Sequence, residues 1–385
     1  MSQEKNVAPL PYGRQIIDDE DINAVVEVLK SDWLTTGPWV KRFETTFAQT
    51  VGAEYAVAVS SGTAALHAIM AAIGIESGDE VIVPPITFAA TANCVIYQGG
   101  TPVFADVDAD TLLIDPDAVE SAITSKTKAV VAVDYAGQPC DYKRLREICD
   151  RHDLVLVADA CHALGAFWND RPVGSLADLT AFSLHPVKLI TAGEGGVVST
   201  DNPEWDQRLR RFRNHGINFD HHQRQERASW AYDIPELGFN YRLTDIQCAL
   251  AESQLKKLPA WIKRRNELAQ MYQAALAQLP GVTPLRINDG LQHAYHLFVV
   301  LFEAEDGRVR ESVFHALRGQ GIGVNVHYVP VYRLSFYQRR FALAPGLCPN
   351  AEFAYTRMLT LPLHPGMDEG DVNRVVSALK CAVET

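Results

Sequence analysis

Short apolar runs alternate with amphipathic stretches over the first half of the chain. Seven runs rich in Val, Ala and Phe predict strands at residues 55–59, 80–84, 101–105, 129–133, 154–158, 179–183 and 196–200. Stretches with helical spacing separate several of them, at residues 63–73, 89–97, 115–123 and 142–150. Strands that are apolar throughout and separated by helices are typical of a mostly parallel sheet covered on both faces. Ligands of such sheets bind beyond the carboxyl ends of the strands.

The periodicity changes after Tyr241. A long helical tract is predicted over residues 243–279, interrupted at Pro259 and ended by Pro280-Gly281. The elements predicted beyond it are a strand at 296–302, a helix at 309–318, a strand-like segment at 323–328 and a helix at 371–383. This order indicates a smaller α+β domain that is joined to the first domain through the long helix.

The length of 385 residues fits two domains, since a domain has about 150 residues on average. We place a large domain, which includes an N-terminal arm, at residues 1–255 and a small C-terminal domain at residues 256–385. Apolar residues make up 47% of the chain and charged residues 21%, which is ordinary for a globular protein and argues against disorder.

Charge and cysteine content narrow the class of protein. The net charge of −12 disfavours a broad nucleic-acid-binding face, because an acidic surface repels phosphate backbones. The seven cysteines form no CxxC pair, so no metal site is predicted, and reduced thiols fit the cytosol. The first residues lack the pattern of a signal peptide, and no apolar run approaches the ~20 residues of a membrane span. We therefore expect a cytoplasmic protein without a membrane partner.

Lys188 lies just past the predicted strand at 179–183 and before a Gly-rich turn at 193–196. A lysine is usually a solvated surface group. At the end of a buried strand, however, desolvation lowers its pKa and makes it a nucleophilic amine that can form a Schiff base. Position alone leaves both interpretations open.

Asp159 and His162 follow the predicted strand at 154–158. An Asp in this position often caps the next helix. The alternative is a carboxylate that keeps a pyridine nitrogen protonated, so that the ring accepts electrons from a carbanion. His162 could pack over such a ring or hydrogen-bond to it, although a lone histidine is more often structural.

Two further segments follow strands of the same sheet. Residues 60–65, Ser-Ser-Gly-Thr-Ala-Ala, open a helix, where backbone N–H groups bind phosphate. An ordinary helix cap is equally compatible, and the segment matches neither a P-loop nor a dinucleotide-binding fingerprint. Phe88 is either a core residue or a ring that stacks on a planar cofactor. Because these signals fall on four strand ends of one sheet, together they favour one ligand site.

Six segments carry a family resemblance: DYAGQP, DACHALGA, SLHPVKLITAGEGGVV, FRNHGI, GFNYRLTDIQCALAESQLKKL and GIGVNVHYVPVYRLSFYQ. With the residues above, they resemble the DegT/DnrJ/EryC1/StrS family over nearly the whole chain. Its members are nucleotide-sugar aminotransferases that depend on pyridoxal 5′-phosphate (PLP) and have the aspartate aminotransferase (type I) α/β fold. The HPVK and VHYVPVY segments are most similar to members that act in pseudaminic acid biosynthesis.

The resemblance implies a role for each residue of the cofactor site. Lys188 would form the Schiff base with PLP, and Asp159 would pair with the pyridine nitrogen. His162 and Phe88 would flank the ring. Asn240 would reach the phosphate from the neighbouring subunit, which implies a homodimer with a shared active site. The phosphate contacts within one subunit would be Gly62, Thr63 and Ser183.

Other positions match family contacts to the nucleotide sugar. These are Tyr12, Trp33, Leu34, Thr35, Ser61, His185, Asn325, Val326, His327 and Tyr328. Asn325 stands where the family has a Gln, so its amide has a shorter reach. Leu184 stands where an aromatic residue is more usual, and we assign it to packing. Arg242 is the sequence candidate for binding the carboxylates of the amino donor.

The implied reaction transfers the amino group of L-glutamate to C4 of a UDP-4-keto-6-deoxy-N-acetylhexosamine. The product would be UDP-4-amino-4,6-dideoxy-N-acetyl-β-L-altrosamine, with pyridoxamine phosphate (PMP) as the cofactor form between the half-reactions. One alternative is another nucleotide-sugar aminotransferase, acting at C3 or C4 of a TDP- or GDP-sugar. A sugar dehydratase of the family would have His in place of Lys188. A non-catalytic binding or sensor protein of this fold would have no reason to keep both Lys188 and Asp159.

Overall fold

A seven-stranded sheet forms the centre of the molecule in the computed structural model, which describes residues 8–219, 228–303 and 307–384. The strand order is β1-β9-β8-β5-β4-β2-β3, and β9 alone runs antiparallel to its neighbours. The strands are β1 (Tyr55–Val59), β2 (Glu80–Val83), β3 (Thr101–Phe104), β4 (Thr127–Val133), β5 (Val155–Asp159), β8 (Leu179–Ser183) and β9 (Gly196–Thr200). All seven predicted strands are confirmed within two residues at each end.

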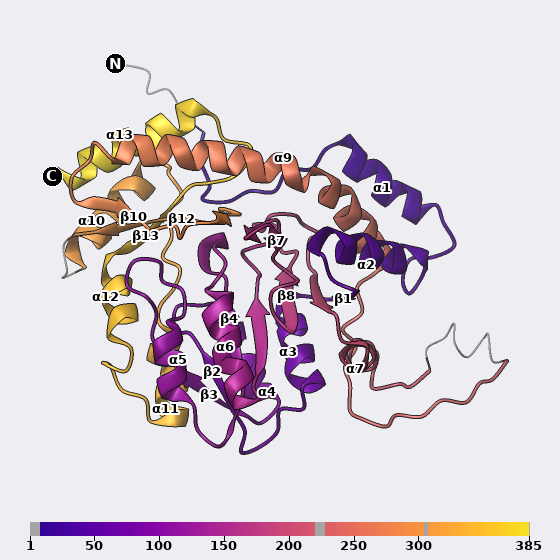
Figure 1. The fold of residues 1–385 in the computed structure, drawn as a ribbon. Coiled ribbons are helices and arrows are strands. Elements are labelled where there is room, and N and C mark those ends of the chain that lie inside the picture. Colours follow the sequence, from indigo (N-terminus) through magenta and orange to yellow (C-terminus); the bar gives the residue numbers. More distant parts are fainter. Residues whose placement is uncertain (1–7, 220–227, 304–306, 385) are drawn as a thin grey trace.

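Helices cover this sheet (Figure 1). The four predicted between the strands are present as α3 (Gly62–Ala72), α4 (Ala90–Tyr97), α5 (Pro116–Ala122) and α6 (Tyr142–His152). Five of the described helices had no sequence prediction: α1 (Asp19–Leu29), α2 (Pro38–Val51), α7 (Pro203–Arg213), α11 (Ser335–Phe341) and α12 (Pro349–Arg357). In α1 the apolar residues Ile22, Val25, Val26 and Leu29 have helical spacing, so the sequence did contain a signal for this helix, although only Asp21 and Val28 are buried in it.

The predicted interruption at Pro259 is wrong, because α9 (Asp245–Leu276) runs unbroken through it. A proline inside a helix removes one backbone hydrogen bond and costs about 3 kcal/mol or more. Here Pro259 lies on the exposed side of the helix, while Leu255, Leu258 and Ile262 are buried on either side of it. Tertiary packing of these apolar residues offsets the local cost and keeps the helix continuous.

The C-terminal part has its own small sheet, with the strand order β10-β12-β13. Its strands are β10 (Val282–Pro284), β12 (Phe298–Phe302) and β13 (Met358–Leu361), and its helices are α10 (Arg308–Gly319), α11 (Ser335–Phe341), α12 (Pro349–Arg357) and α13 (Glu369–Val383). The expected strand at 323–328 is wrong in extent, since only Asn325 makes a bridge, to Thr360. Three two-residue strands, β11 (Leu291–Gln292), β6 (Phe167–Trp168) and β7 (Arg171–Pro172), form a third sheet.

The seven-stranded sheet and the small C-terminal sheet each have their own hydrophobic core. The second core packs α9, α10 and α13 on the small sheet through residues such as Leu268, Phe298, Val313 and Leu379. Leu10 of the N-terminal arm joins this second core, where its N–H donates to the carbonyl oxygen of Gly321 at 2.9 Å. The domain boundary at residue 255 falls inside α9 and stays a prediction. None of the described helices has the length and apolar character needed to cross a membrane.

Candidate active site

Asp159, the last residue of β5, is buried at the carboxyl edge of the central sheet. The Thr91 hydroxyl of α4 donates to Asp159 Oδ2 at 2.7 Å, and the backbone N–H of Cys161 donates to Oδ1 at 3.2 Å. The hydroxyls of Thr87 and Thr91 are themselves 2.7 Å apart. These bonds fix the orientation of the buried Asp159 carboxylate, so that it can pair with one specific group of a ligand.

Lys188 follows β8, the strand beside β5, and is half-buried. Burial lowers the pKa of Lys188 below its usual value, while the nearby Cys161 and Asp159 act in the opposite direction. Because desolvation dominates, the neutral amine is more populated than on an exposed lysine. A neutral amine at a sheet edge is able to attack an aldehyde or ketone.

The start of α3 lies tightly against the ends of two neighbouring strands. Ser61 caps the helix by accepting from the N–H of Ala64 at 3.0 Å. A side chain at Gly62 would lie 3.0 Å from Ser183 Cβ, and one at Gly196 would lie 2.3 Å from the Ser61 carbonyl oxygen. The absence of these two side chains keeps the helix start beside Ser183. The first N–H groups of a helix lack intrahelical acceptors, so this position suits an anion such as phosphate.

His162, Tyr328 and His296 form a buried ring cluster near Lys188. The Tyr328 hydroxyl lies 3.2 Å from His162 Nε2, and the rings of His162 and His296 are 4.4 Å apart. His162 Nδ1 is buried without a partner among the described residues. Burial, followed by the charge of Lys188, holds the pKa of His162 well below its usual range. Phe88 is 61% exposed and lies 6.2 Å from the Tyr328 ring, so its face is open to a planar group.

These features fit a planar aldehyde with a phosphate and a ring nitrogen. Lys188 supplies the amine, Asp159 a fixed carboxylate, and the α3 start an anion-binding position. The unpartnered His162 nitrogen and the exposed Phe88 ring lie where a ring-shaped ligand would give them contacts. Among the described residues no cluster of His, Cys, Asp or Glu is placed to hold a metal ion.

The model of the DegT/DnrJ/EryC1/StrS aminotransferase family matches residues 15–380. This chain belongs to that family. It is therefore an enzyme of the type I fold, and its cofactor is PLP. Members of the DegT/DnrJ/EryC1/StrS family with solved structures include sugar aminotransferases.

Three relatives illustrate the likeness. The spore coat polysaccharide biosynthesis protein SpsC of Bacillus subtilis is 42% identical over 379 residues, 97% of each chain. PseC of Helicobacter pylori, an aminotransferase in pseudaminic acid biosynthesis, is 34% identical with a TM-score of 0.92, covering 98% of this chain and 99% of PseC. Spr1654 of Streptococcus pneumoniae is assigned as a sugar aminotransferase and was solved in its PMP form. It is 31% identical to this chain with a TM-score of 0.93, and the match covers 97% of this chain and 99% of Spr1654.

Some of the predicted sugar-contact residues lie beside the cofactor site. The ring of Tyr12 is 5.3 Å from His327, whose Nδ1 lies 2.9 Å from the Thr360 hydroxyl. The amide oxygen of Asn325 accepts from the N–H of Val326 at 2.9 Å, and its amide nitrogen lies 3.3 Å from His327 Nε2. The Asn325 side chain is therefore engaged within its own segment. His185 is exposed, two residues beyond Ser183.

The predicted contacts Trp33, Leu34 and Thr35 lie on an exposed loop that the start of α9 fixes. The buried Asp245 carboxylate accepts from the N–H groups of Gly37 at 2.8 Å and Trp39 at 3.0 Å. The N–H of Asp245 donates to the Leu34 carbonyl oxygen at 3.1 Å. The role of this loop in substrate binding stays a prediction.

Asn240 and Arg242 lie in the segment beside the end of β1. Asn240 is exposed and forms a bridge with Asn214, whose side-chain oxygen accepts from Arg242 at 2.7 Å. Between them, the carbonyl oxygen of Tyr241 accepts from the N–H of Ser60 at 2.8 Å. The contact of Asn240 with the phosphate of a neighbouring subunit and the role of Arg242 in binding the amino donor stay predictions.

Sequence reasoning missed three residues of the site. Thr91 bonds to Asp159, His296 packs on His162, and the Tyr135 hydroxyl donates to the His327 carbonyl oxygen. A weak signal existed for Thr91, which follows Thr87 by one helical turn in the segment already singled out. His296, at the edge of an apolar run, and Tyr135 carry no sequence signal that distinguishes them from core residues.

Proposed function

We propose that this enzyme transfers the amino group of L-glutamate to C4 of a UDP-4-keto-6-deoxy-N-acetylhexosamine. The product would be UDP-4-amino-4,6-dideoxy-N-acetyl-β-L-altrosamine. The observation that carries the proposal is Lys188, a desolvated amine at a sheet edge, beside the oriented carboxylate of Asp159. The likeness to PseC supports the choice of sugar. The higher identity to SpsC supports a surface-sugar pathway more generally.

The geometry of the site supports a proposed role for each residue. Asp159 would hold the ring nitrogen, His162 and Phe88 would contact the two faces, and the α3 start with Ser183 would bind the phosphate. When bound, PLP supplies an electron sink for a carbanion. The amine of Lys188 would take a proton from the α-carbon of glutamate and later deliver a proton to C4 of the sugar. A single amine with a lowered pKa suits both the base and the acid role.

We further propose that two copies of the chain form the active enzyme. Several apolar side chains in the segment just before Asn240 are exposed, including Trp230 at 90% and Leu237 at 81%. Clustered exposed apolar residues mark interaction surfaces. A second copy would cover them and would bring its Asn240 toward the phosphate-binding position.

A rapid-mixing experiment tests the proposal in two steps. Glutamate should convert the cofactor absorbance of the wild-type protein, and a panel of UDP-, TDP- and GDP-keto-sugars should then restore it. We expect the UDP-4-keto-6-deoxy-N-acetylhexosamine to be fastest. Lys188→Ala should abolish both steps while the far-ultraviolet circular dichroism stays unchanged. Faster turnover of a TDP- or GDP-sugar, or amination at C3, would contradict the proposed substrate.

A further inference from the structure

His162 is held by two residues of the C-terminal part of the chain. It follows β5, whereas His296 precedes β12 and Tyr328 lies in the segment after α10. The rings of His162 and His296 are 4.4 Å apart at an angle of 46°, and the Tyr328 hydroxyl lies 3.2 Å from His162 Nε2. His162 and His296 are both 5% exposed. The two imidazoles therefore shield each other from water.

The backbone around Gly137 brings the two histidines together. The N–H of Ala294 donates to the Gly137 carbonyl oxygen at 2.9 Å. A side chain at Gly137 would lie 2.9 Å from the His162 carbonyl oxygen and 3.1 Å from the backbone nitrogen of His296. Gly137 also has a φ of +104°, a conformation that favours glycine. The packing of His296 on His162 is thus set by the backbone and needs no hydrogen bond between the two rings.

The titratable groups that face His162 disfavour a charged imidazole. They are Lys188, His296, His327, Tyr135 and Tyr328. None of these five is a carboxylate, and the carboxylate of Asp159 accepts instead from Thr91 and from the backbone of Cys161. A proton added to His162 would therefore create a second cation beside Lys188 in a site with little water.

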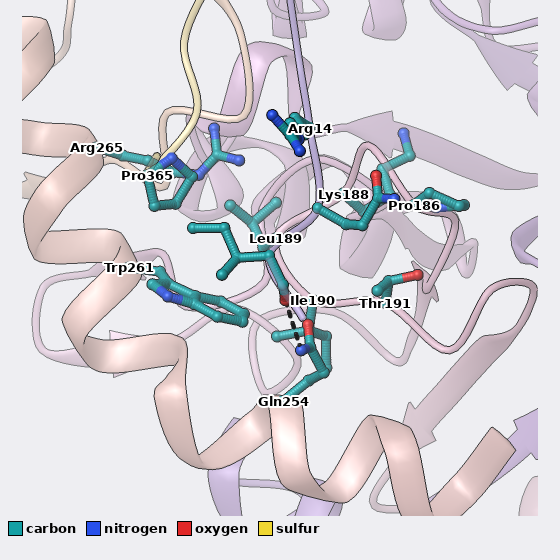
Figure 2. Close-up of a pocket in the computed structure, with 12 residues that line it drawn as sticks. Arg14, Pro186, Lys188, Leu189, Ile190, Thr191, Gln254, Trp261, Arg265 and Pro365 are labelled. Carbon is teal, nitrogen blue, oxygen red and sulfur yellow. Dashed lines mark hydrogen bonds between the residues drawn. The ribbon is translucent and has the colours of Figure 1, made fainter. Parts of the chain in front are cut away.

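His296 lies in the same environment. Burial holds the pKa of His296 well below its usual range, and the charge of Lys188 acts in the same direction. Arg265, which together with Lys188 lines the small cavity shown in Figure 2, adds to this effect. The Nδ1 atoms of His162 and His296 are both buried without a partner among the described residues. Two neutral imidazoles in contact satisfy these surroundings better than one imidazole and water.

We propose that His296 is a positioning residue for the cofactor: it packs on His162, excludes water from it, and so keeps that imidazole neutral beside the cofactor ring. The inference rests on the proposed place of His162 at one face of the ring. A neutral imidazole suits that place, because Asp159 would keep the ring nitrogen protonated and a further cation nearby would repel this proton. In this scheme His296 acts through His162 and takes no proton itself.

Histidine NMR of the PLP-loaded enzyme measures the protonation of His162 directly, with His162→Gln to assign its signal. In the wild type we expect its imidazole to stay neutral down to about pH 5. His296→Ala removes the ring and admits water, so His162 should titrate with a midpoint between about pH 5 and 6.5. The glutamate half-reaction of this variant should slow about threefold or more, relative to the wild type, as the pH falls from about 7.5 to about 5.5. His296→Phe keeps a ring in this place and should behave as the wild type.

His293→Ala is the matched control, because it removes the same kind of side chain from the same segment. The His293 ring is also buried and stacks on Tyr295 at 4.0 Å. This control should leave the titration of His162 unchanged. If His296→Ala yields no folded protein, His296→Val removes less of the packing and takes its place.

Three results would overturn the inference. His162 could titrate near its usual pKa in the wild type, it could stay neutral at about pH 5 in the folded Ala or Val variant, or it could shift equally in His296→Phe or in the control. The spectra need no sugar substrate. Keto-sugars that all fail to react would therefore refute the proposed function alone and leave the role of His296 standing.

Discussion

Thr91→Val isolates the hydrogen bond that orients Asp159. The substitution keeps the side-chain shape and removes the hydroxyl that donates to Asp159 Oδ2 at 2.7 Å. Both residues are buried, so water cannot replace the lost donor. A hydrogen bond to a charged group contributes about 1.5–3 kcal/mol, and the buried Thr87 hydroxyl also loses its partner, which adds about 1 kcal/mol. We expect the free energy of unfolding to fall by about 2–4 kcal/mol.

Thr91→Ser supplies the comparison for this prediction. Serine keeps the hydroxyl and loses one buried methyl group, which costs about 1 kcal/mol. Urea unfolding of the three PLP-free proteins, followed by tryptophan fluorescence, measures the difference directly. The expected order of stability is wild type, then Ser, then Val. If the Val protein were as stable as the wild type and the Ser protein less stable, the methyl group and not the hydrogen bond would hold this position.

Three further predictions concern the surroundings of the site. Gly196→Ala should weaken PLP binding by about tenfold or more, because its side chain would displace the Ser61 backbone, whereas Gly319→Ala meets no atom within 4 Å and should not. Asp245→Asn should raise the KM of the sugar by about tenfold, as measured by steady-state kinetics, without slowing the glutamate half-reaction. Burial lowers the pKa of His67 to about 4, so between about pH 6.5 and 4 the unfolded chain binds one more proton than the folded chain. The free energy of unfolding should therefore fall as the pH is lowered through this window. In thermal melts, it should fall less steeply for His67→Gln than for the wild type.

The central sheet was predictable because its strands are apolar on both faces. Residues 129–133 and 154–158, for example, contain scarcely a polar side chain, and only a sheet covered by helices buries such runs. The continuity of α9 was not predictable, because the local preference of Pro259 opposes the helix. Packing by residues on either side overrides that preference, and local sequence does not show which side of the helix is buried.

The sequence predicted those residues of the site that lie at the ends of apolar strands. Asp159 and Ser183 end apolar strands, and parallel strands bring their carboxyl ends to one edge. The supporting contacts depend on the tertiary fold. Thr91 reaches Asp159 across 68 residues of sequence, and Tyr328 reaches His162 across 166. Arg265 looks like any other basic residue of a long helix until the fold buries it.

Helix α9 connects the loop proposed to bind the sugar with the small cavity beside Lys188. Asp245 at the start of α9 fixes the loop at 33–39, and Arg265 lines the cavity about 30 Å farther along, at roughly 1.5 Å per residue. Between them, Gln254 donates to the backbone of the N-terminal arm at 2.9 Å. Because Pro259 lies between Asp245 and Arg265, a kink there would turn this cavity relative to the loop at 33–39. The packing that keeps the helix continuous therefore also maintains the relative position of the loop and the cavity.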